Sequence, residues 1–172
     1  NFNGTFDDLI NQAIMEERDT QISLSPGFRW GATLLPGQNI RVEDIYSQTA
    51  ITYPAVYRNE MTGKNLKDIL EDVGDNLFNP DPYYQQGGDM VRVGGMGYQF
   101  DVGQTIGSRI SNMTLLETGE KIEPTKTYIV GGWASINEAT KGPAIYDVVS
   151  NYVNRKKSII IKENTNIKIK GM

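Results

Sequence analysis

Apolar residues recur at helical spacing in three segments of the chain, and each segment carries a helix-start signal. The first segment follows Thr5, whose side chain is suited to capping a helix. The second follows Thr62, and Gly74 is expected to end it. The third begins at Gly142-Pro143, because proline suits the first turn of a helix. The stripes that predict these helices are Phe6, Leu9, Ile10, Ala13 and Ile14; Leu66, Ile69, Leu70 and Val73; and Ile145, Val148, Val149 and Tyr152.

Short runs of β-branched and aromatic residues predict strands between these helices. A strand-like run from Ala50 to Met61 contains Pro54, and because proline cannot donate a ladder hydrogen bond, this strand should bend or lie at a sheet edge. Residues 41–46 are compatible with one or two helical turns. The other expected strands are 21–24, 109–116 and 127–130, with a closing strand or pair of strands at 158–161 and 167–170.

The predicted helices and strands do not alternate as regular βαβ units, which indicates an α+β fold. With 172 residues and no internal repeat or low-complexity linker, the chain is expected to form one domain over residues 1–172. No apolar run approaches the roughly 20 residues of a membrane span. Because Asn1 opens a polar segment, no signal peptide is expected within this sequence.

Composition narrows the chemistry that this chain performs by itself. The net charge of −4 and the lack of a basic patch argue against non-specific nucleic-acid binding. The absence of cysteine excludes disulfides and thiolate metal sites. The absence of histidine removes the commonest general base and transition-metal ligand. If the protein is an enzyme, its catalytic groups are therefore expected outside this chain.

A glycine-rich stretch from Gly87 to Asp101 is one candidate binding loop. Its first eleven residues contain five glycines, which allow positive φ angles and a close approach of the backbone to a ligand. Arg92, in the middle, adds a fixed positive charge suited to an oxyanion. The alternative is a tight turn that leads into a core strand at Tyr98, and the loop alone does not decide between them.

A second candidate is the Phe28-Arg29-Trp30 segment, which follows a turn at Ser25-Pro26-Gly27. An arginine between two aromatic residues suits an oxyanion or a planar ligand. The alternative, which the spacing slightly favours, is a strand with both aromatic side chains buried and the arginine in water. Asp7 and Asp8 are interpreted as helix-start residues that complement the helix dipole, and not as metal ligands.

Several segments, taken in order, resemble the C-terminal domain of the 5′-nucleotidase superfamily. The most specific is Met61 to Lys67 followed by Leu70-Glu71, which is similar to the family's LTG-x-x-LK-x-x-LE helix. The resemblance covers nearly the whole chain and implies a mixed sheet with packed helices. The other matches are 27–29 to Gly-Gly-Ile-Arg, 52–54 to Pro-Phe, 93–96 with 100–101 to V-GG-I…YD, and 142–146 to Gly-Gly-Asp-Gly-Phe.

Departures from the nucleotidase pattern point to one branch of the superfamily. The asparagine just before the Gly-Gly-Ile-Arg arginine is replaced here by Leu24-Ser25-Pro26, and the Gly-Gly-Asp-Gly-Phe motif reads Gly142-Pro143-Ala144-Ile145-Tyr146. Another phosphate-gripping arginine would fall at or before Asn1. Segments 25–31 and 86–95 instead resemble the SoxB branch, the thiosulfohydrolases of bacterial sulfur oxidation.

The resemblance implies the specificity half of a two-domain hydrolase. An N-terminal metallophosphatase-like domain, outside this chain, would hold two manganese ions, so no catalytic residue or metal ligand is expected here and the chain alone should be inactive. In the SoxB branch the substrate is a cysteine S-thiosulfonate on the tail of the SoxYZ carrier, the product is sulfate and the location is periplasmic. The expected partners are therefore the N-terminal domain and SoxYZ, with neither nucleic acid nor membrane.

The resemblance also implies the substrate-binding residues. Arg29 would hold the terminal sulfonate, and Tyr53, Trp30 and Tyr146 would line a narrow channel for the carrier arm. The comparison moves the main anion contact from Arg92 to Arg29, and leaves Arg92 pointing to solvent or bracing its loop. The predicted set is Phe28, Arg29, Trp30, Tyr53, Arg92, Gly94, Gly95, Met96 and Tyr146. The alternatives are a nucleotide-binding domain of a 5′-nucleotidase or phosphoesterase, and a non-catalytic binding module.

Overall fold

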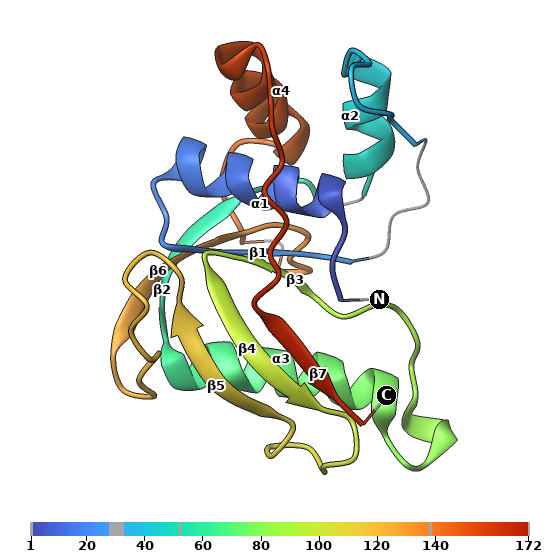
Figure 1. Ribbon diagram of the computed structural model, residues 1–172, viewed down its shortest axis with the longest axis vertical. Coiled ribbons are helices and arrows are strands. Elements are labelled where there is room, and N and C mark those ends of the chain that lie inside the picture. The colour runs from blue at the N-terminus through green and yellow to red at the C-terminus, as the bar shows by residue number, and fades with distance from the viewer. Residues whose placement is uncertain (1, 28–32, 52, 138, 172) are drawn as a thin grey trace.

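The computed structural model describes residues 2–27, 33–51, 53–137 and 139–171. Helices and short strands follow one another without βαβ regularity, which confirms the predicted α+β class (Figure 1). In chain order the elements are α1 (Thr5–Arg18), β1 (Ile22–Ser25), α2 (Val42–Thr49), β2 (Tyr57–Thr62), α3 (Gly63–Phe78), the 3₁₀ helix η1 (Pro82–Tyr84), β3 (Arg92–Gly94), β4 (Met96–Asp101), β5 (Ile110–Leu115), β6 (Thr127–Gly132), α4 (Ile145–Lys156) and β7 (Ile167–Lys170).

The strands form two mixed sheets. The first has the order β2-β6-β1-β3, with β1 parallel to β6 and antiparallel to β3. The second has the order β5-β4-β7, with β7 parallel to β4. Strand β2 lies at the edge of the first sheet and begins three residues after Pro54, as the proline argument predicted.

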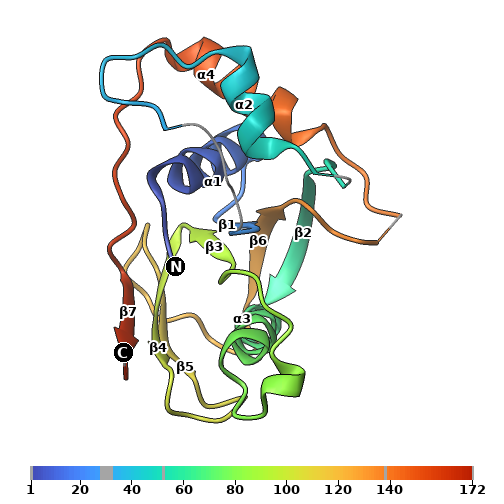
Figure 2. The same cartoon turned by 90° about the vertical axis from the view of Figure 1, so that its right-hand side faces the viewer.

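Two apolar cores hold these layers together, and the three predicted helical stripes face them. One core packs α1 against α4 and includes Ile10, Ile14 and Val149. The other includes Leu70 of α3 and Phe100 of β4, with the second sheet around them. Figure 2 shows α1, α2 and α4 on one side of the molecule and α3 with the second sheet on the other. The first sheet lies between these two groups.

Several predicted boundaries are wrong for tertiary reasons. The N-cap of α1 is Gly4 and not Thr5. Helix α3 continues past Gly74 to Phe78, because this glycine serves packing: a Cβ there would lie 2.7 Å from Cε2 of Phe100. Helix α4 begins at Ile145, two residues after the proline. Residues 158–161 form no strand, and only the 167–170 part of the predicted pair is a strand.

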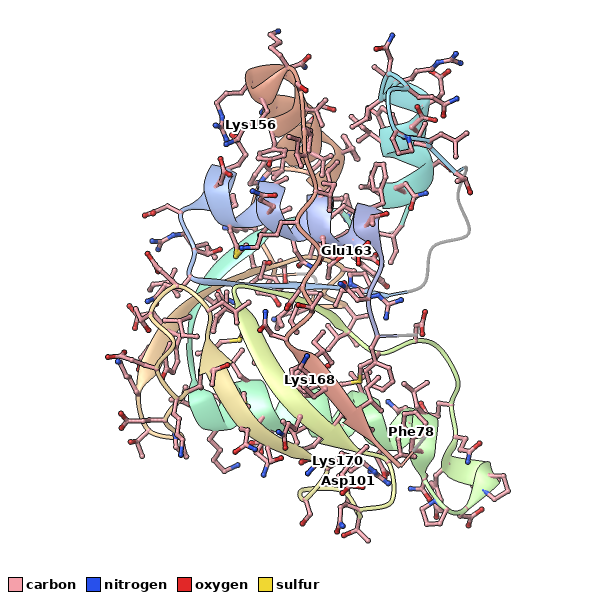
Figure 3. The ribbon with its side chains drawn as sticks, in the orientation of Figure 1. Phe78, Asp101, Lys156, Glu163, Lys168 and Lys170 are labelled. Carbon is pink, nitrogen blue, oxygen red and sulfur yellow. The ribbon has the colours of Figure 1, made fainter. Side chains whose placement is uncertain are left out.

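The C-terminal segment crosses α1 before it joins the second sheet as β7 (Figure 1). Asn164 fixes the crossing, since its Nδ2 donates to the carbonyl oxygens of Val93 at 3.2 Å and Met96 at 3.0 Å. Its backbone N–H donates to Oδ2 of Asp8 in α1 at 3.1 Å. Figure 3 follows this path from Lys156 on α4, past Glu163 at the lower edge of α1, to Lys168 and Lys170 on β7, near the labels of Asp101 and Phe78.

Candidate functional site

A hollow of about 340 Å³ lies where the parallel strands β1 and β6 end. Parallel strands place their carboxyl ends at the same edge, and ligands of α/β sheets commonly bind there. We call this hollow the β1–β6 pocket. Its described lining consists of Leu24, Ser25, Pro26 and Gly27 at the end of β1, Tyr57, Ile69 and Val73, Gly88, Asp89 and Val91 before β3, and Trp133 and Ala134 after β6.

A second hollow of about 400 Å³ shares Tyr57, Trp133 and Ala134 with the β1–β6 pocket. Trp133 is fixed between the two, because its indole Nε1 donates to Oγ of Ser25 at 2.8 Å. Ala134 has a φ of +61°, which is rare for a residue with a side chain and stores strain at the wall. Its N–H donates to the carbonyl oxygen of Tyr53 at 3.2 Å.

Tyr57 lines both hollows, and its hydroxyl lies close to the main chain of Gly132. Burial raises the pKa of its phenol to about 12, because the phenolate would be desolvated. The phenol therefore stays protonated at physiological pH and is not suited to act as a base. Sequence analysis did not select Tyr57 or Trp133. The only local signal for Trp133 was its position directly after the predicted strand that ends in Gly131-Gly132.

Arg92 is buried at the side of the β1–β6 pocket, with 2% of its surface exposed. The idea that it points to solvent is wrong, and the bracing role agrees with its contacts. Its guanidinium donates to Asp7, Asp89 and the carbonyl oxygens of Gly27 and Met90. Its predicted contact with substrate stays a prediction.

The two glycine pairs of the 87–101 stretch lie at opposite ends of β3. Gly88 lines the β1–β6 pocket, whereas Gly94 pairs with Ser23 near the start of β1. Gly95 has a φ of +73° and reverses the chain into β4, and a Cβ there would collide with the carbonyl oxygen of Gln21. Met96 is fully buried in the core. The structure therefore does not bring Gly94, Gly95 and Met96 to this pocket, and their substrate role stays a prediction.

The remaining predicted residues fall in different places. Tyr53 is 41% exposed, next to the wall that Ala134 forms. Tyr146 stacks on Tyr46 of α2 with ring centroids 4.9 Å apart and planes at 28°. Sequence analysis did not select Tyr46. Phe28, Arg29 and Trp30 lie outside the described residues and directly follow Gly27 in the sequence.

Two general features of the described part bear on function. No group of three or more acidic side chains among the described residues is placed to hold a metal ion. None of the helices in that part of the chain has the length and apolar character needed to cross a membrane.

The sequence matches a family model over residues 3–149, and that model describes the 5′-nucleotidase C-terminal domain. The chain belongs to this family. The match spans β1, β6 and the pocket between their ends, so the β1–β6 pocket is a feature of a 5′-nucleotidase C-terminal domain.

Solved structures agree with the family and include one near relative. The sulfate thiohydrolase SoxB of Thermus thermophilus, in complex with glycerol, aligns with a TM-score of 0.90 at 30% identity over 99% of this chain and 33% of its own. A 5′-nucleotidase precursor of the same species aligns with a TM-score of 0.73 at 19% identity over 96% of this chain and 35% of its own. The NAD nucleotidase of Haemophilus influenzae aligns with a TM-score of 0.75 at 18% identity, over 97% of this chain and 33% of its own.

These relatives are hydrolases, and the domain spans about a third of their length. The nucleotidases, at less than 20% identity, support the fold alone. A comparison with curated protein sequences finds no match.

The family motif in α3 has a structural explanation. Thr62 caps the helix by accepting from the N–H of Asn65 at 3.1 Å. Glu71, at the end of the motif, accepts hydrogen bonds from the backbone N–H groups of Gly107, Arg109 and Ile110. The capping and Glu71 contacts of the most specific sequence match therefore stabilise the fold of the domain, and the same helix contributes Ile69 and Val73 to one wall of the pocket.

Proposed function

We propose that this domain is the substrate-binding part of a SoxB-type hydrolase, which releases sulfate from a cysteine S-thiosulfonate on a SoxYZ carrier in the periplasm. The observation that carries the proposal is the alignment with SoxB at a TM-score of 0.90 and 30% identity over 99% of the chain. The nucleotidases align at 0.73 and 0.75 with less than 20% identity.

The remainder of such a protein supplies the reaction centre. The domain covers 33% of the SoxB chain, which leaves room for a separate metal domain. Two manganese ions there would supply an activated water when bound. The water oxygen bonds to the sulfonate sulfur, and the S–S bond breaks. One proton stays on the cysteine persulfide that departs, and a second is lost to solvent as sulfate forms.

This domain contributes binding and orientation. Arg29, which follows Gly27 of the pocket wall in sequence, holds the terminal sulfonate through charge-assisted hydrogen bonds in this proposal. Tyr57 adds a neutral donor, since its pKa of about 12 keeps the phenol protonated. Trp133 provides an apolar wall that is fixed by its hydrogen bond to Ser25. An anionic group at the end of a thin peptide arm suits these features.

The nucleotide-binding alternative would use the ring of Tyr146. In the nucleotidase interpretation, a base would lie between the aromatic residues at positions 53 and 146. Here Tyr46 already stacks on Tyr146, with centroids 4.9 Å apart. A base would need only the other face of the Tyr146 ring, so this stack does not separate the two substrates. The nucleotide-binding alternative is the weaker proposal because the nucleotidases align at lower identity and lower TM-score than SoxB.

The test is the Arg29→Ala variant of the complete protein to which this domain belongs. Loss of the charge-assisted hydrogen bonds to the sulfonate should lower kcat/KM for sulfate release from a thiosulfonated carrier peptide by about a hundredfold. Arg41→Ala is the matched control, because Arg41 is an exposed arginine whose carboxylate partner is the equally exposed Glu43. An Arg29→Ala enzyme with unchanged kcat/KM would contradict the assigned anchor.

A further inference from the structure

Arg92 connects three separate segments of the chain through one buried side chain. Its Nε donates to Oδ2 of Asp7 in α1 at 2.9 Å. Its Nη2 donates to the carbonyl oxygen of Gly27 at 2.9 Å and to Oδ2 of Asp89 at 2.9 Å. Its Nη1 donates to the carbonyl oxygen of Met90 at 3.0 Å. The guanidinium thus contacts the end of β1, the segment before β3 and the first turn of α1 together.

Two of these partners belong to different walls of the β1–β6 pocket. Gly27 and Asp89 both line the pocket, whereas Arg92 and Asp7 are not part of its described lining. The side chain therefore holds the two walls from behind. A charge with only 2% exposure is costly unless its hydrogen bonds are made, and the planar fork of arginine makes several at fixed angles. The geometry of the walls consequently depends on this one group.

The contact at Gly27 leaves no room for adjustment. A Cβ at this position would collide with the carbonyl oxygen of Met90 and would lie 2.9 Å from Cζ of Arg92. The main chain at Gly27 therefore rests directly on the guanidinium. A change in the shape of residue 92 must move the main chain of the wall.

We infer that Arg92 is a positioning residue, which sets the separation of the Gly27 and Asp89 walls for an anionic substrate and does not bind the substrate itself. This role rests on the proposed function, since it assigns substrate binding to the β1–β6 pocket. It differs from the sequence-based expectation that Arg92 contacts the substrate. Through Asp7, the same side chain ties the pocket to the first turn of α1.

Two variants disturb this connection from opposite sides. Arg92→Lys keeps the positive charge but replaces three donating nitrogens with one. Lysine therefore cannot hold Asp7, the Met90 carbonyl and the Gly27–Asp89 pair together. Asp7→Asn keeps the shape of the α1 partner but removes its charge, and Asp7 lies outside the pocket lining. Asp7 contacts Arg92 and not the pocket lining, so Asp7→Asn tests whether the pocket walls respond to a change made behind the guanidinium.

Arg109→Lys is the matched control. Arg109 is 1% exposed, and it too binds a carboxylate and a main-chain carbonyl: its Nη1 donates to Asp75 at 2.7 Å and its Nη2 to Phe78 at 3.0 Å. These partners lie at the end of α3 and outside the β1–β6 pocket. The control therefore reports the effect of altering a buried arginine that has no contact with the Gly27 and Asp89 walls.

The first measurement is steady-state kinetics of the complete protein with the thiosulfonated carrier peptide. We expect Arg92→Lys to raise KM about tenfold while kcat changes less than about threefold, because displaced walls weaken substrate binding. Asp7→Asn should change KM in the same direction, and Arg109→Lys should leave KM within about twofold. An unchanged KM in Arg92→Lys, or an equal rise in Arg109→Lys, would overturn the inference.

The second measurement is hydrogen exchange without substrate, which does not depend on the proposed activity. Arg92→Lys and Asp7→Asn should speed exchange of the paired amides of β1 and β3 at least about tenfold, and Arg109→Lys should not. If the wild-type protein turned over no carrier peptide, the proposed function would fail, and the exchange data would still decide the role of Arg92. Equal exchange in Arg92→Lys and wild type would refute it.

Discussion

The side chain of Asp8, near the start of the chain, forms a hydrogen bond with a residue near its end. Its carboxylate accepts hydrogen bonds from Nδ2 of Asn3 at 2.9 Å and from the backbone N–H of Asn164 at 3.1 Å. Burial raises the pKa of this carboxyl above its usual 3.8, and the neighbouring carboxylates Asp7 and Glu163 raise it further, against the lowering effect of the two hydrogen bonds. Sequence analysis assigned Asp7 and Asp8 to the helix dipole alone. Their contacts with distant segments had no local signal.

The raised pKa of Asp8 predicts a pH-dependent effect of Asp8→Asn on stability. The folded state binds this proton more tightly than the unfolded state, so its contribution is complete below pH 3.8 and is lost as pH rises through the folded pKa. Asparagine stays neutral, and its Oδ1 is able to accept both hydrogen bonds. Urea unfolding should therefore show equal stability of variant and wild type near pH 3, and an increasing advantage of the variant toward pH 7.

Asp72→Asn is the control for this series, because Asp72 is an exposed acid on α3. It should change stability little at any pH in the same range. An Asp8→Asn protein that is less stable than wild type at pH 7 would show that ionised Asp8 stabilises the fold, contrary to the desolvation argument.

At the scale of elements, the spacing of apolar residues was sufficient to predict the three long helices. Their stripes face the two cores because helix burial depends mainly on local spacing. Element ends were not predictable in the same way. Gly74 looked like a helix stop, but the ring of Phe100, 26 residues later, requires the missing side chain inside α3. The run 90–93 is strand-like in sequence, and β3 covers Arg92–Gly94. The separation of β3 and β4 into different sheets on either side of Gly95 was not predicted.

A substitution at Glu71 tests whether the family motif in α3 serves to stabilise the fold. Its carboxylate accepts from the backbone N–H groups of Gly107 at 2.8 Å, Arg109 at 3.2 Å and Ile110 at 2.7 Å. In Glu71→Gln the amide NH₂ would face one or more of these donors, so the free energy of unfolding should fall by about 2 kcal/mol.

Denaturant unfolding measures this loss, and Asp72→Asn on the same helix should stay within about 0.5 kcal/mol of wild type. If Glu71→Gln were as stable as wild type, the motif would need an explanation outside the α3–β5 connection.

At the scale of the whole molecule, sequence motifs identified the family and only part of the site. The motif residues of α3 lie close together in the chain, so the motif can be recognised from the sequence. The β1–β6 pocket could not be predicted in this way, because Gly27, Tyr57, Asp89 and Trp133 come from four distant segments. They meet only through the pairing of β1 with β6, of β2 with β6 and of β1 with β3. Tyr46 was missed for the same reason, since its stack on Tyr146 depends on the docking of α2 against α4.

The central claim is that this domain selects a sulfonated carrier arm and not a nucleotide. The most direct measurement compares kcat/KM of the manganese-loaded complete protein for sulfate release from a thiosulfonated carrier peptide and for phosphate release from AMP. We predict at least about a hundredfold preference for the peptide, because the proposed function assigns Arg29 to the terminal sulfonate. Hydrolysis of AMP without hydrolysis of the peptide would contradict the account.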